Sequence, residues 1–210
     1  MQDAGGRLEV ICGSMFSGKT EELMRRLRRA EYARQNVLTV KHSIDDRKSY
    51  ACIVSHDGSK REAHAVDDTE GSLSQIIKLA TDEIDVIGID EIQFFPEGAL
   101  LLIQALLSQG KRVIVSGLDL NFRKEPFGVV PDLMAMADDV QKLRAICMAC
   151  GAEANFTQRL VNGAPAHYDE PEILVGAEEC YEARCRNCHE LPGEEEVQEL
   201  IFASIDSLAD

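Results

Sequence analysis

The residues best suited to chemistry stand near the N-terminus, where the stretch GSMFSGKT follows the apolar run LEVIC. Gly13, Gly18, Lys19 and Thr20 match the spacing of a phosphate-binding loop that joins a strand to a helix. Backbone N–H groups of such a loop converge on phosphate oxygens, Lys19 adds a positive charge, and the Thr20 hydroxyl can bind magnesium. A glycine-rich turn without a ligand is the alternative. The predicted nucleotide-binding residues of the loop are Gly13, Ser14, Met15, Phe16, Ser17, Gly18, Lys19 and Thr20.

A pair of acidic residues supplies the second part of a phosphate site. The buried-strand pattern VIGID ends in Asp90, and Glu91 follows it directly. We expect Asp90 to complete the coordination of magnesium, and Glu91 to take a proton from the group that accepts the phosphate. The alternative is that both carboxylates only cap the next segment. The spacing does not distinguish water from an alcohol as the acceptor.

Two Cys-x-x-Cys pairs follow in the second half of the chain, Cys147 with Cys150 and Cys185 with Cys188. Four thiolates in this arrangement are typical of a closed tetrahedral zinc site. His189 is an alternative fourth ligand, although the two-residue gap favours Cys188. The odd total of seven cysteines argues against a disulfide framework. The three other cysteines have no such neighbours and are interpreted as small apolar residues: Cys12, Cys52 and Cys180.

The segment between the two cysteine pairs, residues 151–184, is a candidate lid. A structural zinc site contributes about 10 to 16 kcal/mol of apparent binding free energy, whereas ordering the backbone of one residue costs about 1 to 2 kcal/mol. Zinc therefore fixes the two ends of the segment, and packing or substrate must order its middle. The sequence of this segment shows little periodicity.

Four phenylalanines occur in two loop-like stretches, QFFPEG at 93–98 and SGLDLNFRKEPFG at 116–128. Aromatic residues make up only 5% of the chain, so their concentration beside the predicted phosphate site indicates that a flat ring is held there. The alternative is that these rings fill the core. They are Phe94, Phe95, Phe122 and Phe127.

A scaffold of alternating strands and helices must bring these stretches together. Buried strands are expected at 8–12, 37–41, 86–90 and 112–116, and helices at 20–33, 73–80 and 98–109. This alternation predicts an α/β fold with a parallel sheet that is covered on both faces. Ligands of such sheets bind at the carboxyl ends of the strands. Gly110 is suited to end the third helix.

The pattern changes at Pro131, after which a short helix at 133–137 and a strand at 140–146 lead into the cysteine-bearing segment. We expect three parts: a nucleotide-binding α/β domain, a zinc-binding domain, and a C-terminal helix with one apolar face that packs on the protein or on another copy. Their predicted bounds are 1–145, 146–193 and 194–210.

The chain of 210 residues has a formal net charge of −15 and an isoelectric point near 4.7. This acidity disfavours a nucleic acid polymer as partner, because polymer binding needs clustered cations. No basic stretch precedes an apolar core at the N-terminus and no apolar run is long enough to span a bilayer, so we expect an intracellular protein without a membrane partner. The one basic cluster, on the helix predicted at 20–33, is expected to be a solvated face, with a role near phosphates as the alternative: Arg25, Arg26, Arg28 and Arg29.

Taken together, these motifs resemble the type II thymidine kinases, which have a RecA-like P-loop NTPase core and a zinc-binding lasso domain. The resemblance covers nearly the whole chain, from GSMFSGKTEELMRRLRR through VIGIDEIQFF and GLDLNFRKEPFG to YEARCRNC. It implies ATP as the phosphate donor, the 5′-hydroxyl of thymidine or deoxyuridine as the acceptor, and magnesium. It also implies that Glu91 is the catalytic base, and that four further residues lie near the phosphates: Asp45, Arg47, Asp90 and Gln93.

The resemblance further implies how the nucleoside is held. A hydrophobic floor would support the base: Met15, Phe94, Leu118, Phe122 and Phe127. A lasso loop would read its edge with main-chain groups: Glu172, Ile173, Leu174, Val175 and Gly176, assisted by Thr157 and Tyr181. This lasso is longer than in some members, and Ala177 stands where a second glycine is common. A homotetramer, inhibition by dTTP, a role in pyrimidine deoxynucleotide salvage and a cytoplasmic location are also implied.

Two other classes of protein fit parts of the pattern. A RecA-type ATPase with a structural zinc site would hydrolyse ATP in response to DNA, but the acidic balance and the absence of a basic aromatic groove count against it. A nucleotide-binding regulator with a zinc docking module would turn over no nucleoside. The paired acids Asp90 and Glu91 argue against that regulator.

Overall fold

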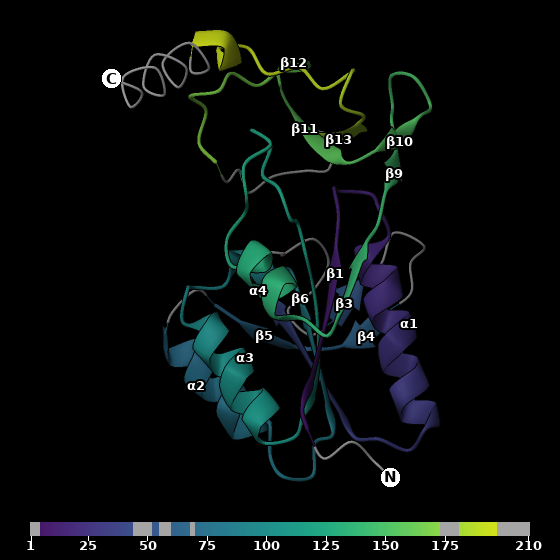
Figure 1. Ribbon diagram of the computed structural model, residues 1–210, viewed down its shortest axis with the longest axis vertical. Helices are drawn as coiled ribbons and strands as arrows, with labels where there is room; N and C mark the ends of the chain where they lie inside the picture. Colours follow the sequence, from purple (N-terminus) through teal and green to yellow (C-terminus); the bar gives the residue numbers. More distant parts are fainter. Residues whose placement is uncertain (1–4, 44–51, 55–59, 68–69, 173–180, 197–210) are drawn as a thin grey trace, which may run out of the picture.

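A computed structural model of the chain describes residues 5–43, 52–54, 60–67, 70–172 and 181–196. Figure 1 shows a large core with helices on two sides of a sheet and a smaller module beyond one end of the strands. The predicted α/β class is confirmed, because the central sheet has six strands and helices lie on both of its faces. No helix in the described ranges is long and apolar enough to cross a membrane.

The central sheet has the strand order β5-β2-β6-β7-β1-β8, and every neighbouring pair is parallel. Its strands are β1 (Arg7–Cys12), β2 (Val37–His42), β5 (His64–Val66), β6 (Val86–Asp90), β7 (Arg112–Gly117) and β8 (Asp139–Lys142). The strand before the phosphate loop, β1, is separated from the strand that ends in the acidic pair, β6, by β7 alone. The carboxyl ends of all three therefore meet at one edge of the sheet, where the predicted site lies.

The helices are α1 (Lys19–Tyr32), α2 (Glu70–Leu79), α3 (Ala99–Ser108) and α4 (Val130–Met136), with a short 3₁₀ turn η1 (Ile92–Phe94). Helix α1 covers one face of the sheet, and the other three lie on the opposite face (Figure 1). Alternation along β1 explains both layers: Leu8 and Val10 pack toward α2, α3 and α4, whereas Ile11 packs against Leu23 and Leu27 of α1. Gly110 adopts a φ of 76° just after α3, as predicted for a glycine that ends a helix.

The prediction that all four arginines of α1 form a solvated face is wrong for Arg26, whose exposed fraction is 9%. Its guanidinium lies 2.6 Å from Glu9 on β1 and 2.9 Å from Asp139 on β8, and it also bonds Glu22 within α1. Glu9 in turn accepts hydrogen bonds from Arg112 at the start of β7. The network ties α1 to three strands of the sheet. Helical spacing alone could not reveal it, because the acids come from other elements.

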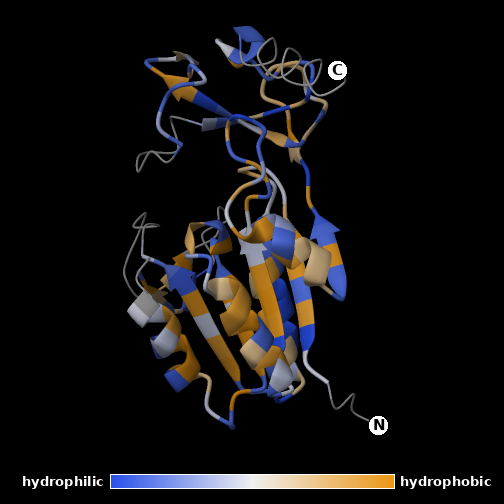
Figure 2. Ribbon diagram, turned by 60° about the vertical axis from the view of Figure 1, so that its left-hand side comes forward, coloured by the Kyte–Doolittle hydropathy of each residue, from blue (hydrophilic) through white to orange (hydrophobic). Residues whose placement is uncertain are grey.

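The smaller module is built from short antiparallel strands. β9 (Ala145–Ile146) pairs with β10 (Glu153–Ala154), and β11 (Phe156–Val161) lies between β12 (Ala164–Pro165) and β13 (Tyr181–Arg184). A separate hairpin joins β3 (Cys52–Val54) to β4 (Lys60–Glu62). The expected strand at 140–146 is two strands, of which β8 belongs to the central sheet and β9 to the module. Figure 2 shows apolar residues concentrated in the central sheet and a more hydrophilic module.

Within the module, β11 gives the candidate lid segment at 151–184 more structure of its own than its sequence indicated. The polar side chains of Thr157, Gln158 and Arg159 are all buried on this strand. The apolar periodicity that marks a strand in a sequence is absent here, because polar contacts fill the interior of this small sheet. In the predicted C-terminal helix, residues 194–196 are helical and 197–210 lie outside the described ranges.

Candidate active site

The phosphate loop has the backbone expected of an anion cradle. Gly13, Phe16 and Gly18 have φ values of 140°, 65° and 85°, so the backbone repeatedly changes hand and its N–H groups turn inward. A Cβ at Gly13 would lie 2.4 Å from the carbonyl oxygen of Leu143, so only glycine fits there. The N-cap residue of α1 is Gly18, and no side chain of the described residues caps this end of the helix. The Lys19 Nζ donates to the Ser14 carbonyl at 2.8 Å, so the lysine folds back over the loop.

Thr20 and Asp90 meet at the edge of the sheet, as predicted for the two residues of a magnesium site. The Thr20 hydroxyl donates to Asp90 Oδ2 at 3.2 Å. The other carboxylate oxygen accepts from the hydroxyl of Ser116, at the end of β7, and from the backbone N–H of Glu91 at 3.1 Å. Asp90 is only 3% exposed. A carboxylate and a hydroxyl held together beside a phosphate loop are the protein ligands that Mg²⁺ takes when substrate phosphates complete its shell.

Glu91 turns away from Asp90, because its backbone φ of 54° places it in the left-handed region. Its Oε2 accepts a hydrogen bond of 2.6 Å from the side-chain amide of Gln93. The carboxamide oxygen of Gln93 accepts from the backbone N–H of Leu118 at 3.1 Å, and this contact identifies which end of the amide faces Glu91. Gln93, predicted to lie near the phosphates, therefore connects the predicted base to the segment that carries the predicted floor.

Two glycines make room for Gln93. A Cβ at Gly117 would lie 2.7 Å from the Gln93 side-chain oxygen, and a Cβ at Gly128 would lie 2.3 Å from its carbonyl oxygen. Gly128 also has a φ of 53°. The sequence did not reveal the contact of these two glycines with Gln93, although both lie in the stretch 116–128 that was noted for its aromatic residues. Their spacing carries no sign of a contact with Gln93, which lies 24 positions before Gly117 and 35 before Gly128.

The phenylalanines predicted near the acceptor lie in different environments. Phe94 and Phe127 contact each other edge to face, with ring centroids 5.8 Å apart, and Phe94 also lies 5.9 Å from His42 at the end of β2. Phe122 is 4% exposed and packs in a separate apolar cluster with Ala166 of the small module. The Phe95 ring belongs to the main core, so the alternative that these residues fill the core holds for Phe95. His42 was not identified from the sequence.

The small module touches the phosphate loop directly. The backbone N–H of Met15 donates to the Thr157 hydroxyl at 3.0 Å, and the Ser14 hydroxyl lies 3.5 Å from the carbonyl of Ala154. Two residues predicted to contact the acceptor, Met15 and Thr157, are thus brought together from positions 142 residues apart. Tyr181 lies in the strand next to β11, opposite Arg159. The structure therefore joins the predicted phosphate loop to the segment predicted to cover the acceptor.

The outer part of the predicted lasso and the segment that follows β2 are only partly described. Glu172 accepts a hydrogen bond of 2.8 Å from the side-chain amide of Asn121, which links the lasso to the loop after β7. Six predicted site residues lie outside the described ranges: Asp45, Arg47, Ile173, Leu174, Val175 and Gly176.

An ion pair joins the end of β8 to the loop that follows β7. Lys142, at the end of β8, pairs with the buried Asp119 at 2.5 Å. Burial, together with the carboxylate of Asp119, raises the pKa of Cys12 to about 11, so this thiol stays protonated as expected for a small apolar residue. Neither partner of the ion pair was identified from the sequence.

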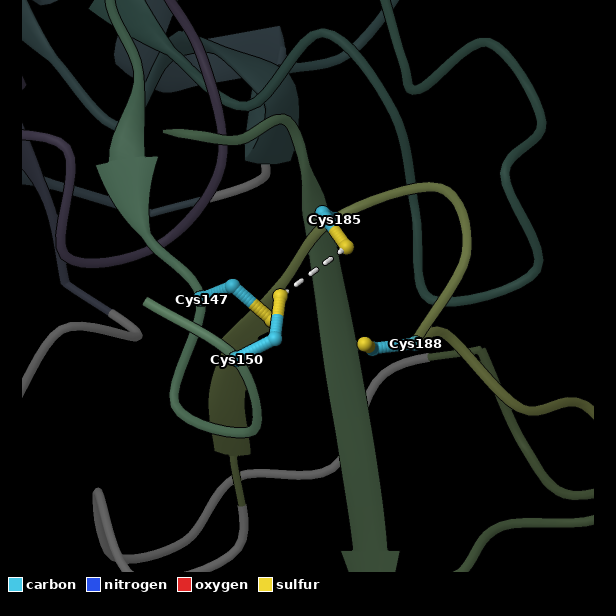
Figure 3. Close-up of side chains that lie close together, drawn as sticks. All are labelled: Cys147, Cys150, Cys185 and Cys188. Carbon is cyan, nitrogen blue, oxygen red and sulfur yellow. Dashed lines mark hydrogen bonds between the residues drawn. The ribbon is translucent and has the colours of Figure 1, made fainter. Parts of the chain in front are cut away.

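The four cysteines of the two Cys-x-x-Cys pairs point toward one another (Figure 3). Their sulfur atoms all lie within 4.8 Å of one another, and those of Cys150 and Cys185 are 3.6 Å apart. This separation is too long for a disulfide and close to the roughly 3.8 Å between ligands of a tetrahedral Zn–S site. His189 packs its ring 5.7 Å from that of Phe156 and is not part of the cluster, so Cys188 is the fourth candidate ligand.

The pKa values of two of these thiols are shifted in opposite directions. Burial alone would raise the pKa of Cys147, but hydrogen bonds from backbone N–H groups, first that of Cys185, lower it to about 6. Hydrogen bonds with the thiols of Cys185 and Cys150 raise the pKa of Cys188 to about 12. Four thiolates this close repel one another unless a cation neutralises them. The cluster can therefore hold a zinc ion, whose role would be structural because all four positions are filled by protein.

Fold and site together define an α/β protein with a six-stranded parallel sheet, a glycine-rich loop at the start of α1 and a four-cysteine cluster beyond the carboxyl ends of its strands. A sequence model of the thymidine kinase family matches residues 6–189. The match extends from the first strand to the last zinc-module residues, so the chain belongs to the thymidine kinase family. It is therefore a kinase, and the family phosphorylates nucleosides.

Among solved structures, the chain is similar to one titled "crystal structure of DNA replication initiation factor". The identity is 14% and the TM-score 0.39, over 65% of this chain and 40% of the other. The chain thus spans about two fifths of that protein's length. A likeness at this level carries no argument about function.

Proposed function

We propose that the protein transfers the terminal phosphate of ATP to the 5′-hydroxyl of thymidine or deoxyuridine, a reaction of pyrimidine deoxynucleotide salvage. The observation that carries the proposal is the divergence of two adjacent carboxylates at the end of β6. Asp90 faces Thr20 of the phosphate loop, whereas Glu91 faces Gln93 and the Leu118 segment. Asp90 is thereby suited to bind a metal ion at the phosphates, and Glu91 is suited to take a proton from the acceptor.

The reaction assigns one task to each group. Backbone N–H groups of the loop and Lys19 would hold the phosphates, and Mg²⁺ at Thr20 and Asp90 would offset the charge on the transferred group. Glu91 would take the proton of the 5′-hydroxyl while the oxygen bonds to the terminal phosphorus and ADP leaves. The lasso would exclude water, which limits hydrolysis of ATP.

The acceptor pocket would lie between the loop after β7 and the small module. Phe94 and Phe127, with half-buried Leu118, supply apolar surface from the core side. Thr157 and Tyr181 approach from the module. The proposal assigns the flat pyrimidine to this space and its edge to the main chain of the lasso, which includes Glu172.

The test compares Glu91→Gln with the wild type and with Glu97→Gln, an exposed acid on the same segment as a matched control. Loss of a general base lowers turnover by about a hundredfold or more, so Glu91→Gln should lose nucleoside phosphorylation at that scale while binding ATP as before. The control should keep full activity. Equal turnover in Glu91→Gln would remove the carboxylate from the mechanism.

Other expectations remain proposals for this chain. The resemblance implies a homotetrameric assembly and inhibition by dTTP, whereas charge and hydropathy favour a cytoplasmic location with no nucleic acid polymer or membrane as partner. Light scattering of the purified protein and inhibition kinetics with dTTP test the first two, and a mass other than four chains would contradict the tetramer. Stimulation of ATP hydrolysis by DNA would instead support the RecA-type ATPase.

A further inference from the structure

The largest fully buried side chain of the described protein is a cation. Arg159, on β11, is 1% exposed, and none of its contacts in the described ranges is to a carboxylate. Its guanidinium donates to the carbonyl oxygen of Pro171 and lies 5.3 Å from the centroid of the Phe122 ring. Its Nε has no hydrogen-bond partner among the described residues. Burying a charge without a counterion is unfavourable, so the site calls for an explanation.

A second arginine reaches the same place from the core. Arg123, in the loop after β7, donates to the carbonyl oxygens of Tyr168 and Glu170, both at 2.7 Å. Its guanidinium lies 5.1 Å from the ring centroid of Phe122 and at the same distance from that of Tyr168. Two guanidinium groups from different parts of the fold therefore share one aromatic ring.

The loop that carries Arg123 is held in one conformation. The side-chain oxygen of Asn121 accepts from the backbone N–H groups of Arg123 at 2.9 Å and Glu125 at 3.0 Å, which closes a tight turn. The Tyr168 hydroxyl donates to Glu125 at 2.6 Å. Arg123 is thus presented by a turn that Asn121 closes from the core side and that Tyr168 holds from the module.

The acceptors of the two arginines form a short continuous stretch of main chain. Three carbonyl groups, those of Tyr168, Glu170 and Pro171, turn toward the guanidinium groups within residues 168–172. This stretch leads into the predicted lasso, whose first residue, Glu172, is itself bonded to Asn121. Hydrogen bonds from a charged donor to a neutral carbonyl oxygen are strong and directional. A guanidinium can donate such bonds while its plane stacks on an aromatic ring, whereas the ammonium of lysine cannot stack in this way.

We propose that Arg123 and Arg159 form a clamp that positions residues 168–172 against Phe122 and so sets the affinity for the nucleoside. Both are positioning residues, because they act through Phe122 and the lasso main chain. This inference rests on the proposed function, in which the lasso covers the nucleoside base, and on the resemblance, which implies that Phe122 belongs to the acceptor floor. The clamp explains why a buried cation is kept: it fixes carbonyl groups that would otherwise turn to solvent.

The experiment measures kcat, KM for thymidine and KM for ATP in Arg123→Met, Arg123→Lys, Arg159→Met and Arg159→Lys. Arg186→Met is the matched control, since Arg186 stacks on Phe156 at 4.8 Å in the same module but is exposed. We expect both methionine variants to raise KM for thymidine about tenfold or more with KM for ATP within about twofold. Arg123→Lys should be intermediate, Arg159→Lys should resemble Arg159→Met, and the control should match the wild type.

Hydrogen exchange gives a readout that does not need turnover. The amide of Tyr168 bonds the Pro192 carbonyl and that of Glu170 bonds the His167 carbonyl, so both are protected in the intact protein. Exchange of a peptide spanning residues 166–172 should accelerate about tenfold in Arg123→Met and stay unchanged in Arg186→Met. If Arg159→Met does not fold, Arg123→Met decides alone.

Unchanged exchange in Arg123→Met, or equal rises in KM for thymidine and for ATP, would overturn the clamp. A wild-type protein that phosphorylates no nucleoside would overturn the proposed function instead, while faster exchange in the same variant would still establish the clamp.

Discussion

Replacing Gln93 by leucine tests how the predicted base is held. Leucine has a similar size but makes neither of the two hydrogen bonds of the amide, one to Glu91 Oε2 at 2.6 Å and one from the Leu118 N–H at 3.1 Å. The substitution therefore removes the connection between the Glu91 carboxylate and the backbone at Leu118. Because Gln93 is 3% exposed, water does not readily replace the lost partners.

The magnitude follows from the bond to the carboxylate. A hydrogen bond to a charged group contributes about 1.5 to 3 kcal/mol, and each 1.36 kcal/mol corresponds to a tenfold change in rate. If the bond orients Glu91 in the transition state, kcat should fall by about tenfold to a hundredfold. KM for ATP should stay within about twofold of the wild-type value, because Gln93 contacts Glu91, the proposed catalytic base, rather than the phosphate loop.

Steady-state kinetics with ATP and nucleoside varied separately measure both constants. The matched control is Gln158→Leu, since Gln158 is 2% exposed and its side chain is also held by hydrogen bonds, two with the backbone of Glu190 and one to the carbonyl oxygen of Arg159. The control should lower stability but leave kcat unchanged. A Gln93→Leu enzyme with a normal kcat and a raised KM for ATP would refute this reasoning and favour a role for Gln93 at the phosphates.

Three further predictions follow from single contacts. Gly128→Ala would drive a Cβ toward the Gln93 carbonyl, so it should lower both Tm and kcat, and an unchanged kcat would contradict the need for glycine beside Gln93. Burial would raise the pKa of Glu9, but hydrogen bonds from Arg112 and Arg26 lower it, so its contribution to stability is present at neutral pH and lost in acid. Denaturant titrations should accordingly show Glu9→Gln destabilised by about 3 kcal/mol at pH 7 and by progressively less as the pH falls below the ordinary glutamate pKa of about 4.3 and through the lowered pKa of Glu9, whereas a constant difference would contradict this. Removing zinc with a chelator should lower Tm in calorimetry and raise KM for nucleoside more than KM for ATP, and an unchanged thermogram would contradict a structural metal.

The parts of the fold that were predictable from sequence are those with local patterns. The phosphate loop, the strand ending in Asp90 and the two cysteine pairs each occupy a short stretch whose residue types carry the chemistry. The four inner strands β1, β2, β6 and β7 were also predictable, because burial on both faces gives them continuous apolar runs, whereas the outer strand β5 was not predicted. In each case the physical cause lies within a few residues of the feature.

The parts that were not predictable depend on contacts between distant segments. Arg26 has the spacing of a solvated helix residue and is buried because Glu9 and Asp139 reach it from the sheet. Gln93 faces Glu91 only because the Leu118 N–H fixes its amide. Strand β11 is filled with polar side chains whose partners lie in other segments, so its sequence has no apolar period.

The most direct test of nucleoside phosphorylation follows the label of γ-labelled ATP when the purified protein is incubated with each common nucleoside in turn. We expect label on the 5′-oxygen of thymidine and deoxyuridine, but not on deoxycytidine or purine nucleosides, and no transfer by Glu91→Gln. Label released only as inorganic phosphate, with no nucleoside product from the wild-type protein, would contradict this expectation.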